Sequence, residues 1–490
     1  MKMHIVSRLL LPVLVACLGL TLAGRVTAQT FTALHSFTAA DYDRSNMPQG
    51  YPTIITNSDG AHPQARLILS GNTLYGTTPD GGPPGFGTVF AVNTDGTGFT
   101  NLHIFTAAKY INNSGAGNGV FINSDGIRPY GGLILSGNTL YGTARSGGTS
   151  GYGTVFSINT DGTGFTTLHS FADPYFGPVA GLILSGNTLY GTTIGGGSSL
   201  FGTVFAVNTD GTGFTTLHSF TAGSDGCSPK AGLILSGNTL YGTTSECGSS
   251  GGYGTVFAVN TDGTGFRTLH GFFAISDGAY PRAKLILLGN TLYGTTTGGG
   301  SSFNGTVFAI NTDGTGFRKL HNFTGGSDES DPYAGLIASS SGNTLYGTAS
   351  SWTQNGNGTV FAVNTNGTGF TTLYRFTGGS DGAKPWADLL LSGNTLYGTA
   401  SFGGTNGSGT VFSLSLDPVI RPQLTIIRSA PNVILSWPTN ATGFVLQSAT
   451  TPTNGGDWRN WLLRSTITNG QNVVTVNPTS PTAFFRLRQP

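Results

Sequence analysis

Residues Ser70–Thr78 read SGNTLYGTT, and the core of this phrase, Asn-Thr-Leu-Tyr-Gly-Thr, occurs seven times in the chain. The copies begin at Asn72, Asn138, Asn187, Asn238, Asn290, Asn343 and Asn394. They are 66, 49, 51, 52, 53 and 51 residues apart, a spacing typical of propeller blades or solenoid turns. The chain is therefore a tandem repeat, and a functional site must be sought where the copies differ.

Each copy contains four segments with the composition of β-strands, denoted a, b, c and d. In the third copy they are residues 180–184, 187–193, 202–208 and 214–220. The Asp-Gly pair between c and d supplies the positive-φ positions of a hairpin turn. The pattern predicts four antiparallel strands per repeat, which make one propeller blade, and no helix.

The two ends of the repeat region indicate how the array closes. Segment d follows the first six copies but is missing after the seventh, whereas a lone d segment, Phe31–Phe37, stands near the start of the chain. This strand can complete the last blade and remove the exposed edges of an open array. We predict an all-β fold: a seven-bladed β-propeller of four-stranded blades closed by the N-terminal strand, over residues 29–416.

The repeat unit resembles a known family. Gly-Asn-Thr-Leu-Tyr-Gly-Thr, Gly-Thr-Val-Phe, Asn-Thr-Asp-Gly-Thr-Gly-Phe and Leu-His with a following Phe are similar to the GloVer tandem repeat of exported bacterial proteins, named for Gloeobacter and Verrucomicrobia. The double glycine after segment b resembles kelch blades, more weakly. The resemblance covers residues 31–416 and implies export, but it implies no reaction, cofactor or catalytic residue.

The N-terminus has the layout of a secretory signal peptide. Basic residues precede an apolar run, and Val-Thr-Ala at 26–28 offers small residues for cleavage. Residues 14–17 also match a bacterial lipobox, but the apolar run continues beyond Cys17, which favours cleavage after residue 28. We expect the mature protein to be secreted, either free outside the cell or associated with its surface, and we expect no membrane span.

Composition excludes several function classes. Charged residues are only 9% of the chain, and the net charge of +1 leaves no basic surplus to bind nucleic acid. No metal-binding or nucleotide-binding motif occurs, so neither a cofactor nor a metal ion is expected. After signal removal the only cysteines are Cys227 and Cys247, in two loops of the fourth repeat, and export favours a disulfide between them.

The repeat stops at a linker containing two prolines, residues 417–422. Residues 423–490 contain about six short segments with alternating hydrophobicity, among them Val433–Trp437. This region resembles a fibronectin type III-like β-sandwich with Trp437 in its core. In exported bacterial proteins such a module implies a spacer or attachment role.

Six histidines occupy one position in segment d, which are His35, His103, His169, His218, His270 and His321. Sevenfold geometry would hold them too far apart to share one metal ion, so we expect a structural role. Their expected partner is the Asp of the following Ser-Asp-Gly turn, such as Asp225 or Asp277. Two repeats leave the pairing open. The repeat that contains His169 lacks the Ser-Asp-Gly turn, and in another repeat Tyr374 stands in place of the histidine that would pair with Asp381.

Few carboxylates are left once the turns are explained. Eleven of the 21 Asp and Glu residues lie in hairpin or Ser-Asp-Gly turns. Of the others, Glu329 with Asp331, or Asp388 at the start of a segment a, are candidates for the carboxylates that a glycosidase or lyase would need. The preferred explanation is that they are solvated loop residues, and no catalytic residue is assigned.

The variable loops indicate where a ligand binds. The d–a and b–c loops differ between repeats and lie on one face, whereas the opposite face is nearly identical in every repeat. The residue after the Pro that leads into segment a gives a ring of unlike side chains at the channel mouth, which are Gln64, Tyr130, Val179, Lys230, Arg282, Tyr333 and Trp386. With Trp352 from a b–c loop, the predicted ligand site is Tyr130, Lys230, Arg282, Tyr333, Trp352 and Trp386.

The aromatic pair Trp352 and Trp386, with Tyr333 nearby, suits the apolar face of a sugar ring. Packing between blades is the alternative explanation for each aromatic residue. Our first hypothesis is an exported, non-catalytic protein that binds an extracellular glycan or a cell-surface protein. The second is a carbohydrate-active enzyme, a glycoside hydrolase or polysaccharide lyase, with its site at the channel mouth.

Overall fold

The computed structural model describes residues 29–43, 54–111, 119–173, 177–248, 251–351, 356–417, 424–429, 432–438, 445–449, 459–460, 465–468, 471–476 and 484–488. The expected signal peptide lies outside these residues. Contacts divide the chain into two compact units, with the repeat region Gln29–Asp417 in one and the region from Pro418 in the other. The described residues contain strands and no helix, so none of them forms a helix that could cross a membrane.

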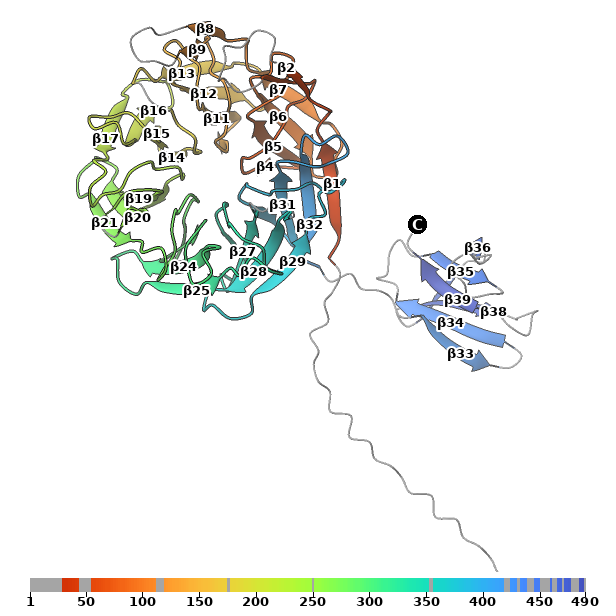
Figure 1. Ribbon diagram of the computed structural model, residues 1–490. Helices are drawn as coiled ribbons and strands as arrows, with labels where there is room; N and C mark the ends of the chain where they lie inside the picture. Colours follow the sequence, from red (N-terminus) through yellow and green to blue (C-terminus); the bar gives the residue numbers. More distant parts are fainter. Residues whose placement is uncertain are drawn as a thin grey trace, which may run out of the picture. The chain divides into compact units, whose positions relative to one another are not determined.

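The repeat region consists of four-stranded antiparallel sheets that follow one another around a ring (Figure 1). Sheet 1 is β4 (Ile68–Ser70), β5 (Thr73–Thr78), β6 (Thr88–Asn93) and β7 (Thr100–Ile104). Sheet 2 is β10 (Ile134–Ser136), β11 (Thr139–Ala144), β12 (Thr154–Asn159) and β13 (Thr166–Ser170). Sheet 3 is β14 (Ile183–Ser185), β15 (Thr188–Thr193), β16 (Thr203–Asn208) and β17 (Thr215–Ser219).

The remaining sheets of the ring repeat this order. Sheet 4 is β18 (Ile234–Ser236), β19 (Thr239–Thr244), β20 (Thr255–Asn260) and β21 (Arg267–Gly271). Sheet 5 is β22 (Ile286–Leu288), β23 (Thr291–Thr296), β24 (Thr306–Asn311) and β25 (Arg318–Asn322). Sheet 6 is β26 (Ile337–Ala338), β27 (Thr344–Ala349), β28 (Thr359–Asn364) and β29 (Thr371–Arg375). The prediction of repeated four-stranded antiparallel sheets in an all-β chain is confirmed.

Sheet 7 joins the two ends of the repeat region. It contains β30 (Leu390–Ser392), β31 (Thr395–Ala400), β32 (Thr410–Ser415) and β1 (Phe31–Ser36). Strand β1 pairs antiparallel with β32, with Phe31 opposite Leu414 and Ser36 opposite Thr410, and Figure 1 shows the red β1 beside the blue β32. The first described strand therefore takes the place of the d strand that the seventh repeat lacks.

The long d–a loops before sheets 1 and 2 contain hairpins of their own. One is formed by β2 (Asp41–Asp43) and β3 (Ile54–Thr56), the other by β8 (Lys109–Ile111) and β9 (Val120–Ile122). The repeat unit is thus extended twice by insertions that leave its four-stranded sheets intact.

The phrase Asn-Thr-Leu-Tyr-Gly-Thr recurs because its glycine lies under an aromatic ring. In sheet 3 a Cβ added to Gly191 would lie 2.5 Å from Cζ of Phe205 on β16 and 2.8 Å from Cδ2 of Leu182. Phe205 is fully buried, so its ring has no free space to move into. A side chain at this position of strand b would displace the centre of the sheet's packing.

The last threonine of the same phrase links each sheet to the next by a hydrogen bond. Oγ1 of Thr192 donates a hydrogen bond of 3.1 Å to the backbone carbonyl of Ala231 in sheet 4. The equivalent bonds run from Thr77, Thr143, Thr243, Thr295, Thr348 and Thr399 to the next inner segment around the ring. The bond of Thr399 reaches Pro63, so the same contact also joins the last sheet to the first.

The hydrophobic core lies between neighbouring sheets. Tyr190, Val204 and Phe220 of sheet 3 pack with Leu233 and Phe257 of sheet 4 in one buried cluster. Similar clusters form between the other neighbours. Each sheet therefore shields one face of the next, and no single sheet holds a core alone.

The repeated histidine also lies at the boundary between sheets. The ring of His218 stacks on Phe266 of the next sheet with 3.7 Å between centroids, and its Nε2 is 3.3 Å from Oδ2 of Asp225. Asp225 also accepts hydrogen bonds from the backbone N and Oγ1 of Thr221. Burial raises the pKa of this carboxyl, but the bonds from Thr221 and His218 outweigh it, and the pKa is lowered.

The expected His–Asp contact is present at five of the six histidines, which are His35, His103, His218, His270 and His321. His169 only stacks, on Phe214 at 3.8 Å, and makes no carboxylate hydrogen bond in the described part of the chain. At the boundary between sheets 6 and 7, which we term the seam, Tyr374 takes over both contacts. Its hydroxyl donates to Asp381 at 2.9 Å, and its ring stacks on Phe31 at 4.2 Å.

The C-terminal unit contains two sheets. One has the order β33 (Thr425–Ser429), β34 (Asn432–Pro438), β38 (Gln471–Val476) and β37 (Thr466–Thr468). The other has the order β36 (Arg459–Asn460), β35 (Val445–Ala449) and β39 (Phe484–Arg488). Trp437 is buried, as expected, in a cluster with Leu435, Leu446, Val474 and Val476.

Replacing the buried glycine should destabilise the repeat region. We expect Gly191→Ala to reduce the free energy of unfolding by about 1–3 kcal/mol, because the methyl group overlaps the ring of Phe205. Gly298→Ala is the control, since its Cβ would lie 3.4 Å from its nearest neighbour, an ordinary contact. Chemical denaturation of both variants measures the difference, and equal stability would contradict this account of the phrase.

The disulfide should contribute measurably to stability. Cys227 in a d–a loop and Cys247 in a b–c loop are joined by a disulfide across 20 residues. Closing a loop of this length in the unfolded chain stabilises the fold by about 3 kcal/mol. Reduction should therefore lower the melting temperature, and thiol titration of the denatured, unreduced protein should detect no free thiol. Two free thiols per chain would show that the bond does not form.

Acid should destabilise the ring through the partly buried His169. Burial lowers the pKa of His169 from 6.5, so the folded state binds fewer protons than the unfolded state as the pH falls from about 7 to about 5. Stability is lost in that window. His169→Phe keeps the stacked geometry on Phe214 and should flatten the dependence of the melting temperature on pH there. An unchanged dependence would place the acid sensitivity elsewhere.

Candidate functional site

A cavity of about 440 Å³ lies where the chain enters the innermost strands of the sheets. All seven residues of the predicted ring line it, namely Gln64, Tyr130, Val179, Lys230, Arg282, Tyr333 and Trp386. The structure thus brings together five of the six residues of the predicted ligand site. The sixth, Trp352, lies outside the described residues.

An unusual backbone conformation delivers the ring residues to the cavity. Each follows a proline, and in six of the seven repeats the residue before that proline has a positive φ of 54° to 60°, at His62, Arg128, Ser228, Tyr280, Asp331 and Lys384. Non-glycine residues rarely adopt this left-handed conformation.

Hydrogen bonds on both sides hold this conformation. Tyr280 N donates to the carbonyl of Tyr253 in the preceding sheet at 2.9 Å, and Thr297 N donates to the carbonyl of Tyr280 at 3.2 Å. The strained residue therefore bridges two sheets. The next residues, Pro281 and Arg282, are set at the cavity by this bridge.

One side of the cavity wall is aromatic. The rings of Tyr333 and Trp386 are 6.3 Å apart, and the guanidinium of Arg282 lies 5.4 Å above Tyr333. Phe402 from the b–c loop of sheet 7 is not among the residues that line the cavity; it meets Trp386 edge-on at 5.4 Å and is 38% exposed. These four residues form a continuous arc, which we term the aromatic arc.

Phe402 was missed in the sequence. Its position makes the isolated bridge Ala383–Phe402, and the equivalent bridges of other repeats contain Asp80, Ser146, Glu246 and Gly298. The sequence feature that could have revealed Phe402 is a phenylalanine at a position where these other repeats have polar or small residues. It could have been found by comparing the b–c loops in this register.

Another part of the wall is polar. The guanidinium of Arg145 lies 5.6 Å from the ring centre of Tyr130, and Nζ of Lys230 forms an ion pair of 2.7 Å with Oε1 of Glu246. Burial, with a smaller effect from the charge of Asp80, raises the pKa of the Tyr130 hydroxyl, so this group stays protonated. Tyr130 therefore offers a hydrogen-bond donor away from the aromatic arc.

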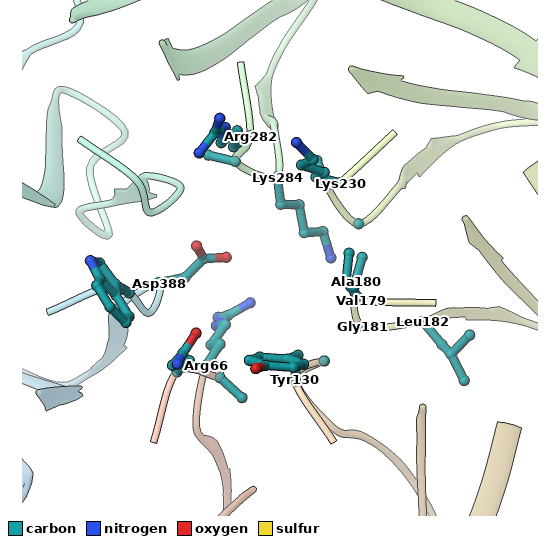
Figure 2. A pocket seen from close by; sticks show the side chains of 18 of the residues that line it. Arg66, Tyr130, Val179, Ala180, Gly181, Leu182, Lys230, Arg282, Lys284 and Asp388 are labelled. Atoms are coloured by element: carbon teal, nitrogen blue, oxygen red, sulfur yellow. The ribbon is translucent and has the colours of Figure 1, made fainter. Parts of the chain in front are cut away.

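A second tier of residues lies two positions further along each inner segment. Its members are Arg66, Gly132, Gly181, Gly232, Lys284, Gly335 and Asp388. A Cβ on Gly181 would lie 2.7 Å from the carbonyl oxygen of Gly132, so the backbones approach closely here. Figure 2 shows Arg66, Lys284 and Asp388 extending from different segments into the same space.

The charged members of this inner tier influence one another. Burial lowers the pKa of the Lys284 ammonium and the Arg66 guanidinium lowers it further, whereas Asp388 opposes the shift. Oδ1 of Asp388 accepts a hydrogen bond of 2.6 Å from Gly335 N. Sequence reasoning singled out Asp388 but missed Arg66 and Lys284. The sequence feature that could have revealed them is that this position is glycine in four repeats and a charged residue in three.

The other candidate carboxylates lie away from the cavity. Glu329 is buried and forms an ion pair with Arg375, and Asp331 accepts a hydrogen bond from Oγ of Ser330. Asp388 is the one described carboxylate among the residues that line the cavity. In the part of the chain that the structure describes, no group of three or more His, Cys, Asp or Glu side chains could hold a metal ion.

Comparison with known proteins identifies the repeat. The Gloeobacter/Verrucomicrobia repeat model matches residues 49–174, 173–343 and 325–425. No curated protein matches the sequence. Among solved structures, the GH74 xyloglucanase from Xanthomonas campestris is 11% identical, with 84% of this chain and 59% of that chain covered and a TM-score of 0.51. An oligogalacturonate lyase in complex with manganese is 11% identical, with 80% and 97% covered and a TM-score of 0.45. The likeness to the xyloglucanase concerns the fold alone.

Proposed function

The chain belongs to the Gloeobacter/Verrucomicrobia repeat family, and we propose that it is an exported seven-bladed propeller that binds an extracellular glycan without transforming it. The glycan binds on the face formed by the d–a and b–c loops, at the mouth of the channel. The C-terminal unit, as a fibronectin type III-like module, serves as a spacer or attachment domain. The N-terminal segment directs secretion and is then removed.

One observation carries this proposal: a position that holds six residue types in otherwise similar repeats lines a single cavity. The scaffold needs its Leu, Gly and Thr residues in every repeat, but packing does not require six different residue types at one position. Loops on a rigid scaffold commonly carry recognition. Variation along the wall of a cavity therefore supports a binding site.

The shape and chemistry of the cavity favour a glycan over a protein partner. A volume of about 440 Å³ falls in the range of small-ligand sites. A stable protein partner would instead cover roughly 800 Å² of a flatter surface. The aromatic arc offers ring faces to the apolar side of a sugar, while Tyr130 and Lys230 offer donors to its hydroxyl groups.

The alternative is a carbohydrate-active enzyme, and the inner tier favours one form of it. Hydrolysis of a glycosidic bond commonly uses two carboxyl groups, whereas the described wall provides Asp388 alone. Lys284 has a lowered pKa and could act as a base, as a polysaccharide lyase requires. Appearance of unsaturated ends in a polysaccharide incubated with the protein would establish this alternative.

Removing the tryptophans should abolish glycan binding. We expect Trp352→Ala with Trp386→Ala to weaken binding at least about tenfold, because aromatic stacking is a major part of such sites. The melting temperature should stay nearly unchanged, since Trp386 is only partly buried. A glycan array identifies the ligand and calorimetry measures the affinity.

Tyr42→Ala is the matched control, because Tyr42 is a 67% exposed aromatic residue on the β2–β3 hairpin. It should bind as the unchanged protein does. A double tryptophan variant that is folded and binds normally would show that the channel mouth is not the site.

A further inference from the structure

Positive charge is concentrated in the cavity. The whole chain has 22 Lys and Arg against 21 Asp and Glu, a net charge of +1. The cavity is lined by five of these cations, Arg66, Arg145, Lys230, Arg282 and Lys284, and by a single carboxylate, that of Asp388. A site for a neutral sugar would not require this imbalance.

Among the described residues, Arg66, Arg282 and Lys284 form no ion pair with a carboxylate within 4.0 Å. Lys230 is paired with Glu246, and Arg145 lies against Tyr130. Cations that line a cavity without carboxylate partners are costly unless a ligand supplies the opposite charge.

Two guanidinium groups also have unused donors. Nε of Arg66 and Nε of Arg282 are buried and have no hydrogen-bond partner in the protein. Buried donors are nearly always paired, so each such atom calls for an explanation. A planar oxyanion can accept two hydrogen bonds from one guanidinium, which would satisfy a donor of this kind.

The fold does not need these cations. At the position of Arg66 and Lys284, four other repeats have glycine and still form the same sheet. The two residues are therefore additions to the scaffold, aimed into the channel (Figure 2).

We propose that the ligand of the cavity is an anionic saccharide, whose carboxylate or sulfate group binds to Arg66 and Lys284 while its ring packs against the aromatic arc. This inference rests on the proposed glycan-binding function and names the class of glycan. Arg282, which lies at the junction of the arc and the inner tier, contacts both the anion and the ring. Asp388 limits the number of negative charges that the site accepts.

The test uses calorimetry to measure the affinity of the full-length protein for three oligosaccharides of equal length. One is a uronic acid oligomer, one a sulfated galactan oligomer and one a neutral galactan oligomer. We expect at least one acidic oligomer to bind about tenfold or more tightly than the neutral one, since hydrogen bonds between charged groups are the stronger kind. The acidic arms distinguish carboxylate from sulfate as the group recognised. Raising the salt concentration should weaken only the acidic binding.

Variants that copy other repeats isolate the role of the cations. Arg66→Gly and Lys284→Gly introduce the residue found in four repeats, and each should weaken acidic binding about tenfold and reduce the preference for acidic over neutral oligomers. Lys319→Thr is the charge-matched control, because Lys319 is exposed on β25 and other repeats have Thr there. Asp388→Asn keeps the acceptor for Gly335 N and should strengthen acidic binding. If Arg66→Gly lowers the melting temperature, Arg66→Gln removes the same charge while keeping a longer side chain than glycine.

The outcomes separate this inference from the proposed function. Equal affinity for neutral and acidic oligomers, or acidic binding unaffected by the two glycine variants, would overturn the anionic assignment and leave glycan binding intact. Binding of none of the three would contradict both. Cleavage of an acidic oligomer that binds through Arg66 and Lys284 would support the anionic site and overturn the non-catalytic role.

Discussion

A phenylalanine ring resting on a glycine is the contact on which every sheet of the repeat region depends. At Gly191 and Phe205 the two adjacent strands meet without any side chain between ring and backbone. The ring can then lie in the boundary with the preceding sheet, where it shares a buried cluster with Tyr141, Val155 and Phe171 of that sheet. Close packing of this kind tolerates little change in volume. Repetition of the whole phrase follows, because a different residue at the glycine would disturb two sheets at once.

Closure of the ring uses a variation on the same boundary. Six boundaries place a histidine on a phenylalanine, and the seam places Tyr374 on Phe31. The tyrosine hydroxyl reaches Asp381 as the histidine ring nitrogen does elsewhere. The seam is thus chemically distinct but geometrically equivalent. Because its partner is contributed by β1, the same contact that joins neighbouring sheets also fastens the N-terminal strand.

Much of the architecture of the repeat region could be predicted from the sequence, because the fold is determined by local patterns that repeat. The repeat spacing, the turn residues and the lone d segment near Phe31 predict the sheets and their order. Each of these features can be found by reading neighbouring residues or by aligning the repeats in one register. The ring of unlike residues was also predictable, as Trp386 and its equivalents share a position after a proline. Arg66 and Lys284 were missed because their repeats were compared at the ring position and not two residues later. Phe402 was missed because b–c loops of different length hide their register until the backbone pairs them.

The glycines of the inner tier have one more consequence. Gly132, Gly181 and Gly232 come from three consecutive sheets, so one side of the lumen is bare backbone, whereas Lys284, Asp388 and Arg66 project from the sheets opposite. A ring built from near-identical units has no preferred direction around its axis, and a molecule entering it could settle in several equivalent rotations. An uneven lumen removes that degeneracy. The bare side accepts bulk and the charged side sets polarity, so an elongated molecule can lie across the opening in one direction only.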